Sequence, residues 1–287
     1  MPRRPHDRRR LCRRSDRPRR NPSRRSLRRH DDRTLRGAGR PAIHRATRIP
    51  CRLARAGGAR GTTLGVSITL SEAESRRVVS EYGVPVSPFV TGTSTAEVLA
   101  AVETDASVTF PVVAKLCGRA IAHKTERGLV RLRIADTDAL AAACDELLSK
   151  AVPEDGEVEV LVSTMVDGNR ELIAGLNDDP QFGMTVMVGI GGILAEAIRD
   201  VSFRLAPITE VDAAEMLDDL ATQRLFGEFR GEPAADRAAI VDALVALARV
   251  GVEEPGLRSA DLNPLILVDG KPIAVDALLE IEEDSDA

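Results

Sequence analysis

The chain has 287 residues, 43% of them apolar, and a formal net charge of −4 at pH 7. This length is enough for one large domain or two small ones, each with its own hydrophobic core. No run of about 18 or more apolar residues occurs, which excludes a membrane-spanning helix, and the start lacks the apolar stretch of a secretory signal. The four cysteines lack disulfide or metal-site spacing, so we expect a reduced, cytoplasmic protein.

Charge divides the chain into two parts. Residues 1–65 hold 22 arginines, no lysine and four acidic residues, a formal charge of +18, whereas the remainder carries −22. The first part shows neither helical nor strand periodicity and has too few apolar residues for a core, so we expect it to be disordered. Three origins are open for it: a nucleic-acid-binding arm, an organelle transit segment, or the translation of DNA upstream of the true start.

The absence of lysine before Lys115 favours the third origin. Basic arms usually mix lysine with arginine, whereas arginine with proline, glycine and alanine is typical of GC-rich DNA read without selection for folding. We therefore expect residues 1–65 to be absent from the native protein, with Val66 as its first residue. Nucleic acid is correspondingly not an expected partner.

Local signals predict the elements of the first half of the remaining chain. A helix begins at the N-cap Ser71, carries acidic residues in its first turn and ends at Tyr82-Gly83. A continuous β-branched run predicts a buried strand at 110–116. The other elements expected here are a helix at 95–104, a strand at 129–134, a helix at 138–150 and a strand at 158–166.

The second half ends in a predicted hairpin. Its two arms, at 261–268 and 272–277, are joined by Asp269-Gly270, which is a strong turn signal. Hairpins mixed with helical crossovers predict an α+β fold rather than a regular βαβ repeat. The preceding elements expected are strands at 171–177, 184–188 and 199–207 and helices at 211–223 and 234–250.

Two residues of the first half are candidates for phosphate chemistry. Lys115 lies inside the apolar run FPVVAKL, where a buried lysine is costly unless it meets an anion. The alternative is a lysine on the polar face of an edge strand. His123 lies in the loop AHKTERG and is either a phosphoryl acceptor or donor or a solvated loop residue.

The second half adds two further signals. The glycine-rich run 189–192 follows a predicted strand, and glycines let backbone N–H groups approach phosphate closely. The run is not the common phosphate-binding loop, and it is also what a β-bulge requires. Asn263 and Asp276 lie on the two arms of the last hairpin, and their side-chain oxygens suit Mg²⁺. Turn formation or capping is the alternative.

In combination these features resemble the ATP-grasp fold, with a lysine on an early strand, Glu171 on a later one, a glycine-rich turn and an Asn/Asp pair near the end. The closer similarity is to the ATP-grasp (β) subunit of NDP-forming acyl-CoA synthetases, the acetate–CoA ligase (ADP-forming) family. It runs from about residue 70 to residue 280. The motifs that carry it are FPVVAKL, IAHKTERGLVRL, GNRELIAGLNDDPQFG, MVGIGGILAEAIRDVSFRLAPI, FRGEP and DLNPLILVDGKPIAVDA.

The resemblance implies two α+β subdomains that grip a nucleotide, at about residues 66–160 and 161–287. It implies that Asn263 and Asp276 bind Mg²⁺, and that His123 is the catalytic residue, which relays phosphate between the nucleotide and a histidine of a CoA-binding partner. It also implies a set of nucleotide-binding residues: Lys115 at the phosphates, Val160, Leu161, Val162 and Met165 in the hinge that reads adenine, and Glu171, Gly191 and Gly192 around them. Glu196 and Asp200 are weaker candidates nearby.

The activity implied is the reversible conversion of acyl-CoA, ADP and phosphate into acid, CoA and ATP through acyl phosphate and phosphohistidine. The cofactors implied are ATP or ADP and Mg²⁺. The sequence departs from the family where paired glycines often follow the His-Lys-Thr motif, since here Gly128 is followed by Leu129. It also holds no CoA-binding domain, so we expect an α-type CoA-binding subunit as partner. Two alternatives stay open: an ATP-binding regulatory protein without turnover, and an ATP-grasp carboxylate ligase for another acceptor.

Overall fold

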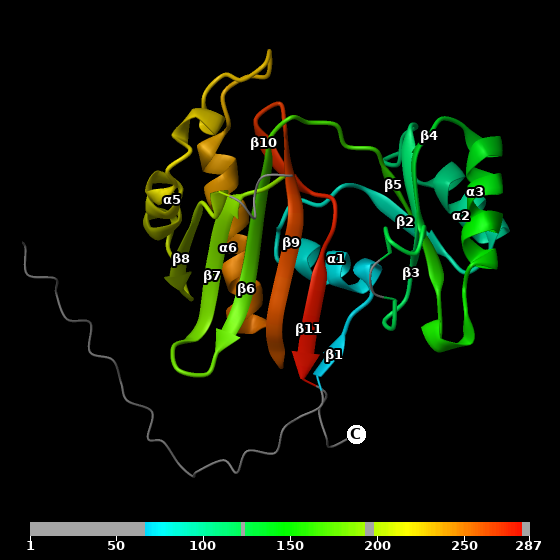
Figure 1. Ribbon diagram of the computed structural model, residues 1–287, viewed down its shortest axis with the longest axis horizontal. Helices are drawn as coiled ribbons and strands as arrows, with labels where there is room; N and C mark the ends of the chain where they lie inside the picture. Colours follow the sequence, from blue (N-terminus) through cyan, green and yellow to red (C-terminus); the bar gives the residue numbers. More distant parts are fainter. Residues whose placement is uncertain (1–66, 122–123, 193–197, 283–287) are drawn as a thin grey trace, which may run out of the picture. The chain divides into compact units, whose positions relative to one another are not determined.

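The computed structural model describes residues 67–121, 124–192 and 198–282, so the arginine-rich segment 1–65 lies outside the described residues. The described part contains two antiparallel sheets, which we call the small sheet and the large sheet (Figure 1). The expected α+β class is confirmed, because every ladder within the two sheets is antiparallel. No helix in the described ranges is long and apolar enough to cross a membrane.

The small sheet has the strand order β2-β5-β3-β4. Two helices cover one of its faces, and their side chains form one core with the sheet. The elements are β2 (Phe89–Gly92), α2 (Thr95–Thr104), β3 (Val112–Cys117), β4 (Val130–Ile134), α3 (Thr137–Ser149) and β5 (Glu159–Thr164).

Strand β3 is buried along its whole length, and its two faces differ in chemistry. Val112, Ala114 and Leu116 belong to the core beneath α2 and α3. Because side chains alternate along a strand, Lys115 and Cys117 lie on the opposite face, where Cys117 packs with Ala73 of helix α1 (Glu72–Glu81). Although the run is mostly apolar, its lysine lies on the strand face that points away from α2 and α3.

Helix α3 begins at the N-cap Asp136, whose carboxylate accepts a hydrogen bond from the amide of Ala139 at 2.9 Å. We expect Asp136→Ala to lower the free energy of unfolding by about 1 kcal/mol, because this amide then loses its partner. Asp136→Asn is the matched control, since asparagine caps equally well. Urea unfolding measures both, and equal stability of the two variants would contradict the capping role.

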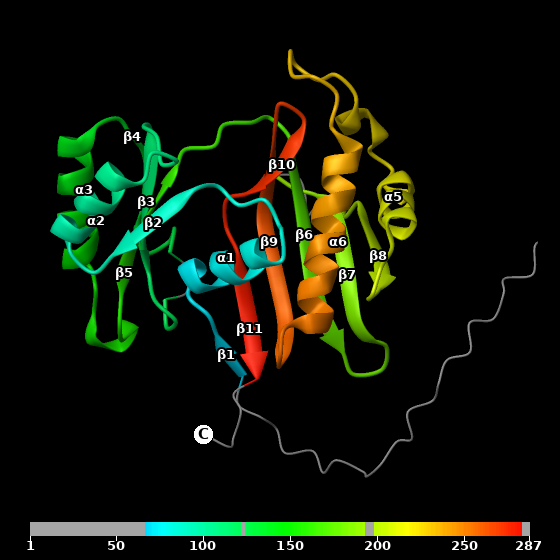
Figure 2. The same ribbon diagram turned by 180° about the vertical axis from the view of Figure 1, so that it is seen from behind.

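The large sheet has the strand order β1-β11-β9-β6-β7-β8, with β10 paired to β9. Figure 2 shows α1 and α6 on one of its faces. Its strands are β1 (Ser67–Thr69), β6 (Glu171–Asp179), β7 (Gly183–Ile190), β8 (Val201–Leu205), β9 (Leu257–Val268), β10 (Lys271–Ala274) and β11 (Leu278–Glu282), and its helices are α1 (Glu72–Glu81), α5 (Glu210–Asp219) and α6 (Arg237–Glu253).

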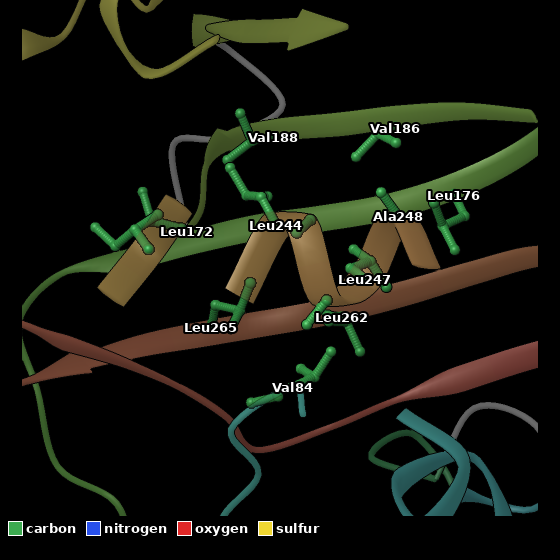
Figure 3. Packing of buried hydrophobic residues seen from close by; sticks show 14 of the residues in the cluster. Val84, Leu172, Leu176, Val186, Val188, Leu244, Leu247, Ala248, Leu262 and Leu265 are labelled. Atoms are coloured by element: carbon green, nitrogen blue, oxygen red, sulfur yellow. The ribbon is translucent and has the colours of Figure 1, made fainter. Parts of the chain in front are cut away.

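Helix α6 buries an apolar stripe against the large sheet. Ile240, Leu244 and Leu247 are spaced four and three residues apart, which places them on one side of the helix, and all three are buried. They meet the inward-facing residues of β6, β7 and β9, such as Leu172 and Leu262 (Figure 3). Residues that alternate with these, including Glu171 and Asn263, therefore face the opposite side of the sheet.

Helix α1 belongs with the large sheet although it precedes the small one in sequence. β1 pairs with β11, and Ser75 of α1 accepts a hydrogen bond from the amide of Leu279 at 3.1 Å. The other side of α1 contacts the small sheet, where Ala73 packs with Leu161. β1 and α1 therefore group with the large sheet although they precede residue 160, because strand pairing joins the first described strand to the last.

Candidate functional site

A cleft of about 510 Å³ lies between the final strands of the large sheet and the segment that follows β3. One side offers mainly carboxylate and amide oxygens, and the other offers cationic side chains. Its lining residues are Thr69, Arg119, Ala120, Ile121, Lys124, Asp261, Asn263, Asp276, Leu278 and Glu280.

The acidic side brings the two predicted metal ligands into one cleft. Asn263 lies on β9 and Asp276 follows β10, and both line the cleft together with Asp261. Burial, and then the charge of Asp276, raise the pKa of Asp261. A pair of carboxylates in which Asp276 disfavours the charge of Asp261, beside an amide oxygen, fits a hard divalent cation such as Mg²⁺.

This donor set is too small to hold a metal without help from a ligand. The described residues contain no group of three or more His, Cys, Asp or Glu side chains arranged as a metal site. Mg²⁺ is commonly bound by one or two carboxylates together with substrate phosphates and water. Asp261 lies two residues before Asn263 but was not among the predicted metal ligands. The structure adds it to the acidic side of the cleft.

Lys115 is buried and uses all of its hydrogen-bonding capacity. Its Nζ donates to Glu72 Oε1 at 2.6 Å, to the carbonyl of Val275 at 3.1 Å and to Asp276 Oδ2 at 3.2 Å. An ammonium group has three donors, so all three are occupied. The edge-strand alternative is excluded, because β3 lies between β4 and β5 and Lys115 meets anions.

Glu72 is a second residue that our sequence analysis read only as a helix-terminal acid. Its carboxylate is fully buried and lies 2.6 Å from Lys115 Nζ, 2.9 Å from Arg76 Nη2 and 2.5 Å from Lys124 Nζ. Burial alone raises the pKa of Glu72, but the charges of Lys115, Arg76 and Lys124 outweigh burial and lower the pKa to about 2. The group is therefore ionised at neutral pH.

The lowered pKa of Glu72 predicts a loss of stability in acid. An unfolded glutamate has a pKa of 4.5, against about 2 in the folded protein, so the stability that ionised Glu72 contributes is present above pH 4.5 and is lost as the pH falls towards 2. We expect the urea midpoint to fall more steeply across this window in the wild type than in Glu72→Gln. Parallel pH profiles of the two proteins would contradict this assignment.

Lys124 directly follows the predicted catalytic residue His123 in the sequence, and it is the first described residue after the gap at 122–123. Burial by itself lowers the pKa of Lys124, but Glu72 and Asp276 outweigh that effect and raise it. His123 itself, like Glu196, lies outside the described residues. The structure therefore places the neighbour of His123 in the charge cluster around Glu72.

Val160, Leu161 and Val162, which were predicted to read the adenine, lie on a strand that is paired along both edges. Strand β5 is paired with β2 on one side and with β3 on the other, so its backbone groups are already used in the two ladders. Met165 follows β5 in the linker to β6, and its amide donates to the carbonyl of Pro111 at 2.9 Å. The segment that contains Met165, between the end of β5 and the start of β6, therefore connects the small sheet to the large sheet.

The remaining predicted nucleotide residues meet one another at the beginning of β6. The amide of Gly191 donates to the carbonyl of Glu171 at 2.7 Å, and a Cβ on Gly191 would lie 3.0 Å from the Glu171 backbone. Gly192 has a φ of +84° and lies beside the Glu171 carboxylate. The two glycines thus allow a close backbone approach, although none of these three residues lines the cleft.

Asp200, a weaker candidate, has a structural role. Its carboxylate accepts hydrogen bonds from the amides of Ala221 at 2.8 Å and Thr222 at 2.7 Å. These bonds fix the chain after α5, and each oxygen of the Asp200 carboxylate has a backbone partner.

Comparison with known proteins assigns this arrangement to a family. The profile of the ATP-grasp domain matches residues 66–281, which include both sheets and all residues of the cleft. The chain belongs to the ATP-grasp family. The ATP-grasp domain thus comprises both sheets, with its acidic and cationic groups facing each other across one cleft.

Two curated relatives of this ATP-grasp domain differ in length. The chain is 34% identical over 211 residues to the acetate–CoA ligase [ADP-forming] I subunit beta of Pyrococcus furiosus, covering 72% of this chain and 90% of that one. It is 36% identical over 215 residues to the acetate–CoA ligase [ADP-forming] I of Archaeoglobus fulgidus, covering 74% of this chain. The chain spans only 31% of that longer relative.

A solved structure resembles the ATP-grasp domain as well. It is the dinucleotide-forming acetyl-coenzyme A synthetase 1 of Ca. Korarchaeum cryptofilum, in complex with coenzyme A and Mg-AMPPCP, with its phosphohistidine segment pointing towards the nucleotide-binding site. The TM-score is 0.63 at 35% identity, and the match covers 74% of this chain and 92% of that one.

Proposed function

We propose that this chain is the nucleotide-binding subunit of an ADP-forming acyl-CoA synthetase, a ligase that uses ATP or ADP with Mg²⁺. The observation that carries the proposal is the cleft, where Asp261, Asn263 and Asp276 face the cationic Lys124. Phosphoryl transfer depends mainly on positioning and on neutralising charge, and these side chains supply both. The similarity to acetate–CoA ligase beta subunits supports the same assignment.

The residues have distinct proposed roles. Asn263 and Asp276 hold the metal, with Asp261 beside them, and Lys115 and Lys124 neutralise the phosphate oxygens. Bound Mg²⁺ supplies further neutralisation of the phosphate charge. For the adenine we propose the linker at Met165, with Glu171, Gly191 and Gly192 bordering the nucleotide site, since β5 itself has no free backbone groups.

We propose His123 as the catalytic residue. A neutral imidazole nitrogen attacks the γ-phosphorus of ATP, a P–N bond forms, the bond to the bridging oxygen breaks, and ADP leaves. In the opposite direction ADP recovers the phosphoryl group. The Korarchaeum enzyme has a phosphohistidine segment that points towards its nucleotide-binding site, which supports phosphoryl transfer through a histidine, and Lys124, the next residue in the sequence, lines the cleft.

A partner and a location follow from the same proposal. The beta subunit from Pyrococcus matches over most of its length, whereas the Archaeoglobus enzyme is about three times longer than the matched part. Because the Pyrococcus relative is named as the beta subunit of its ligase, we propose a CoA-binding, α-type subunit as partner, and reversible conversion of acyl-CoA, ADP and phosphate into acid, CoA and ATP as the joint activity. The buried cysteines Cys117 and Cys144 are free thiols, which supports a cytoplasmic location.

Calorimetric titration of the full chain with ADP, with and without Mg²⁺, tests the nucleotide site. We expect Mg²⁺ to tighten binding by roughly tenfold or more in the wild type, and this gain to disappear in an Asn263→Ala/Asp276→Asn variant. Asp242→Asn is the matched control, because Asp242 is an exposed carboxylate on α6. Absence of ADP binding in the wild type, or an undiminished Mg²⁺ effect in the double variant, would contradict the proposal.

A further inference from the structure

Glu72 joins parts of the chain that are distant in sequence. It is the first residue of α1, which packs with the large sheet, whereas Lys115 lies on β3 of the small sheet and Lys124 lies in the segment after β3. Each oxygen of the carboxylate contacts one lysine: Oε1 is 2.6 Å from Lys115 Nζ, and Oε2 is 2.5 Å from Lys124 Nζ. The carboxylate of Glu72 thus sets the distance between the ammonium groups of Lys115 and Lys124.

The burial of Glu72 distinguishes it from an ordinary surface ion pair. Its side chain is fully buried, while Lys115 and Lys124 are 11% and 17% exposed. In low dielectric an unpaired charge is costly, so each lysine is held strongly to its partner. Glu74, two residues further along the same helix, provides the contrast: it pairs with Arg119, whose side chain is 58% exposed, and such exposed pairs contribute little.

Lys115 has three hydrogen-bond acceptors, and only one of them lines the cleft in which a phosphate would bind. Its three acceptors are Glu72, the Val275 carbonyl and Asp276. Asp276 lines the cleft and Glu72 does not. A phosphate oxygen that enters the cleft can therefore replace Asp276 as a hydrogen-bond acceptor for Lys115. Glu72, which does not line the cleft, remains paired with the same ammonium group.

We propose that Glu72 is a positioning residue, which holds Lys115 and Lys124 at the cleft and thereby anchors the segment 124–129. The inference rests on the function proposed for the cleft. The amide of Leu129 donates to the carbonyl of Lys124 at 2.8 Å, and the amide of Gly128 donates to the carbonyl of Thr125 at 3.1 Å. Fixing Lys124 therefore fixes the backbone that follows it. Glu72 acts through the two lysines and does not contact the reacting atoms.

A double-mutant cycle on the full chain tests this role. The variants are Glu72→Gln, Lys124→Met and their combination, with Glu74→Gln as the matched control on the same helix. The glutamine NH₂ group cannot accept from Lys124, so the second contact is lost while the shape is kept. The readouts are the rate constant of phosphohistidine formation from labelled Mg-ATP and the dissociation constant of a non-hydrolysable ATP analogue.

We expect Glu72→Gln and Lys124→Met each to slow phosphoryl transfer by roughly 10- to 100-fold, because small displacements of positioned groups have effects of this size. Analogue binding should change by less than about threefold, and the double variant should be no slower than the slower single one. Glu74→Gln should transfer within about twofold of wild type. Wild-type rates in Glu72→Gln, or multiplicative effects in the double variant, would overturn the proposal.

Hydrogen exchange gives a readout that does not depend on turnover. In Glu72→Gln, and not in Glu74→Gln, we expect the amides of Gly128 and Leu129 to exchange faster. Equal protection in the two variants would overturn the anchoring role. If Glu72→Gln does not fold, Lys124→Met provides the same comparison. If the wild type forms no phosphohistidine, the proposed function fails, and hydrogen exchange alone decides whether Glu72 anchors the segment.

Discussion

Lys115→Met is expected to slow phosphoryl transfer by roughly 10²- to 10³-fold, the loss typical when one electrostatic donor is removed from a reacting anion. The lysine is fixed by Glu72 behind it and lies 3.2 Å from Asp276 at the cleft. Methionine has a similar length but no charge, so it removes the interaction with phosphate while still filling the space. Single-turnover labelling with Mg-ATP measures the rate, and circular dichroism reports whether the variant folds.

Lys271→Met is the matched control for this substitution. Lys271 is exposed at the start of β10, so its replacement should leave the transfer rate within about twofold of wild type, as is usual for surface substitutions away from the site. A folded Lys115→Met protein that retains more than about a third of the wild-type rate would show that Lys115 neutralises no phosphate charge.

Arg170→Met is expected to lower the free energy of unfolding by about 3–5 kcal/mol, the cost of breaking a buried ion pair from one side. The guanidinium group is 1% exposed and lies 2.9 Å from Glu232. It also donates to the carbonyls of Leu225, Gly227 and Pro233 at 2.7–3.1 Å. Without the guanidinium group, these three carbonyls lose a donor and Glu232 loses its cationic partner.

Urea unfolding at neutral pH measures this loss. The control is Arg249→Met, which removes an exposed arginine that pairs with Glu253 one helical turn away and should lower the free energy of unfolding by less than about 1 kcal/mol. A loss below about 1 kcal/mol in Arg170→Met would mean that the segment 225–233 is held by its own packing and not by Arg170.

Local signals in the sequence were sufficient for the long elements of the fold. The N-cap at Ser71 and the apolar run before Cys117 correspond to α1 and β3. Of the short strands, β10 was predicted from the turn signal at Asp269-Gly270, whereas β1, β2 and β11, of three to five residues, were not predicted, because so few residues carry little periodicity of their own. The pairing of β1 with β11 joins residues more than two hundred positions apart, and no local pattern encodes such a contact.

The candidate site shows the same division between local and distant information. Lys115, Asn263 and Asp276 were identified from residue type and family resemblance, and the structure brings them to one cleft or its wall. Glu72 was read as a helix-terminal acid, because its burial depends on the small sheet closing over α1. The pairing of Val160–Val162 on both sides was not predicted, because an apolar strand looks the same in sequence whether one or both of its edges are paired.

The function proposed for the cleft requires that a phosphoryl group passes from ATP to His123. The most direct measurement is incubation of the full chain with Mg²⁺ and ATP labelled in the γ-phosphate, beside a His123→Ala variant. We predict a base-stable, acid-labile label on the wild-type protein that is missing from the variant while ADP binding is retained. A label of equal amount in both proteins, or nucleotide binding without any label in either, would contradict the claim.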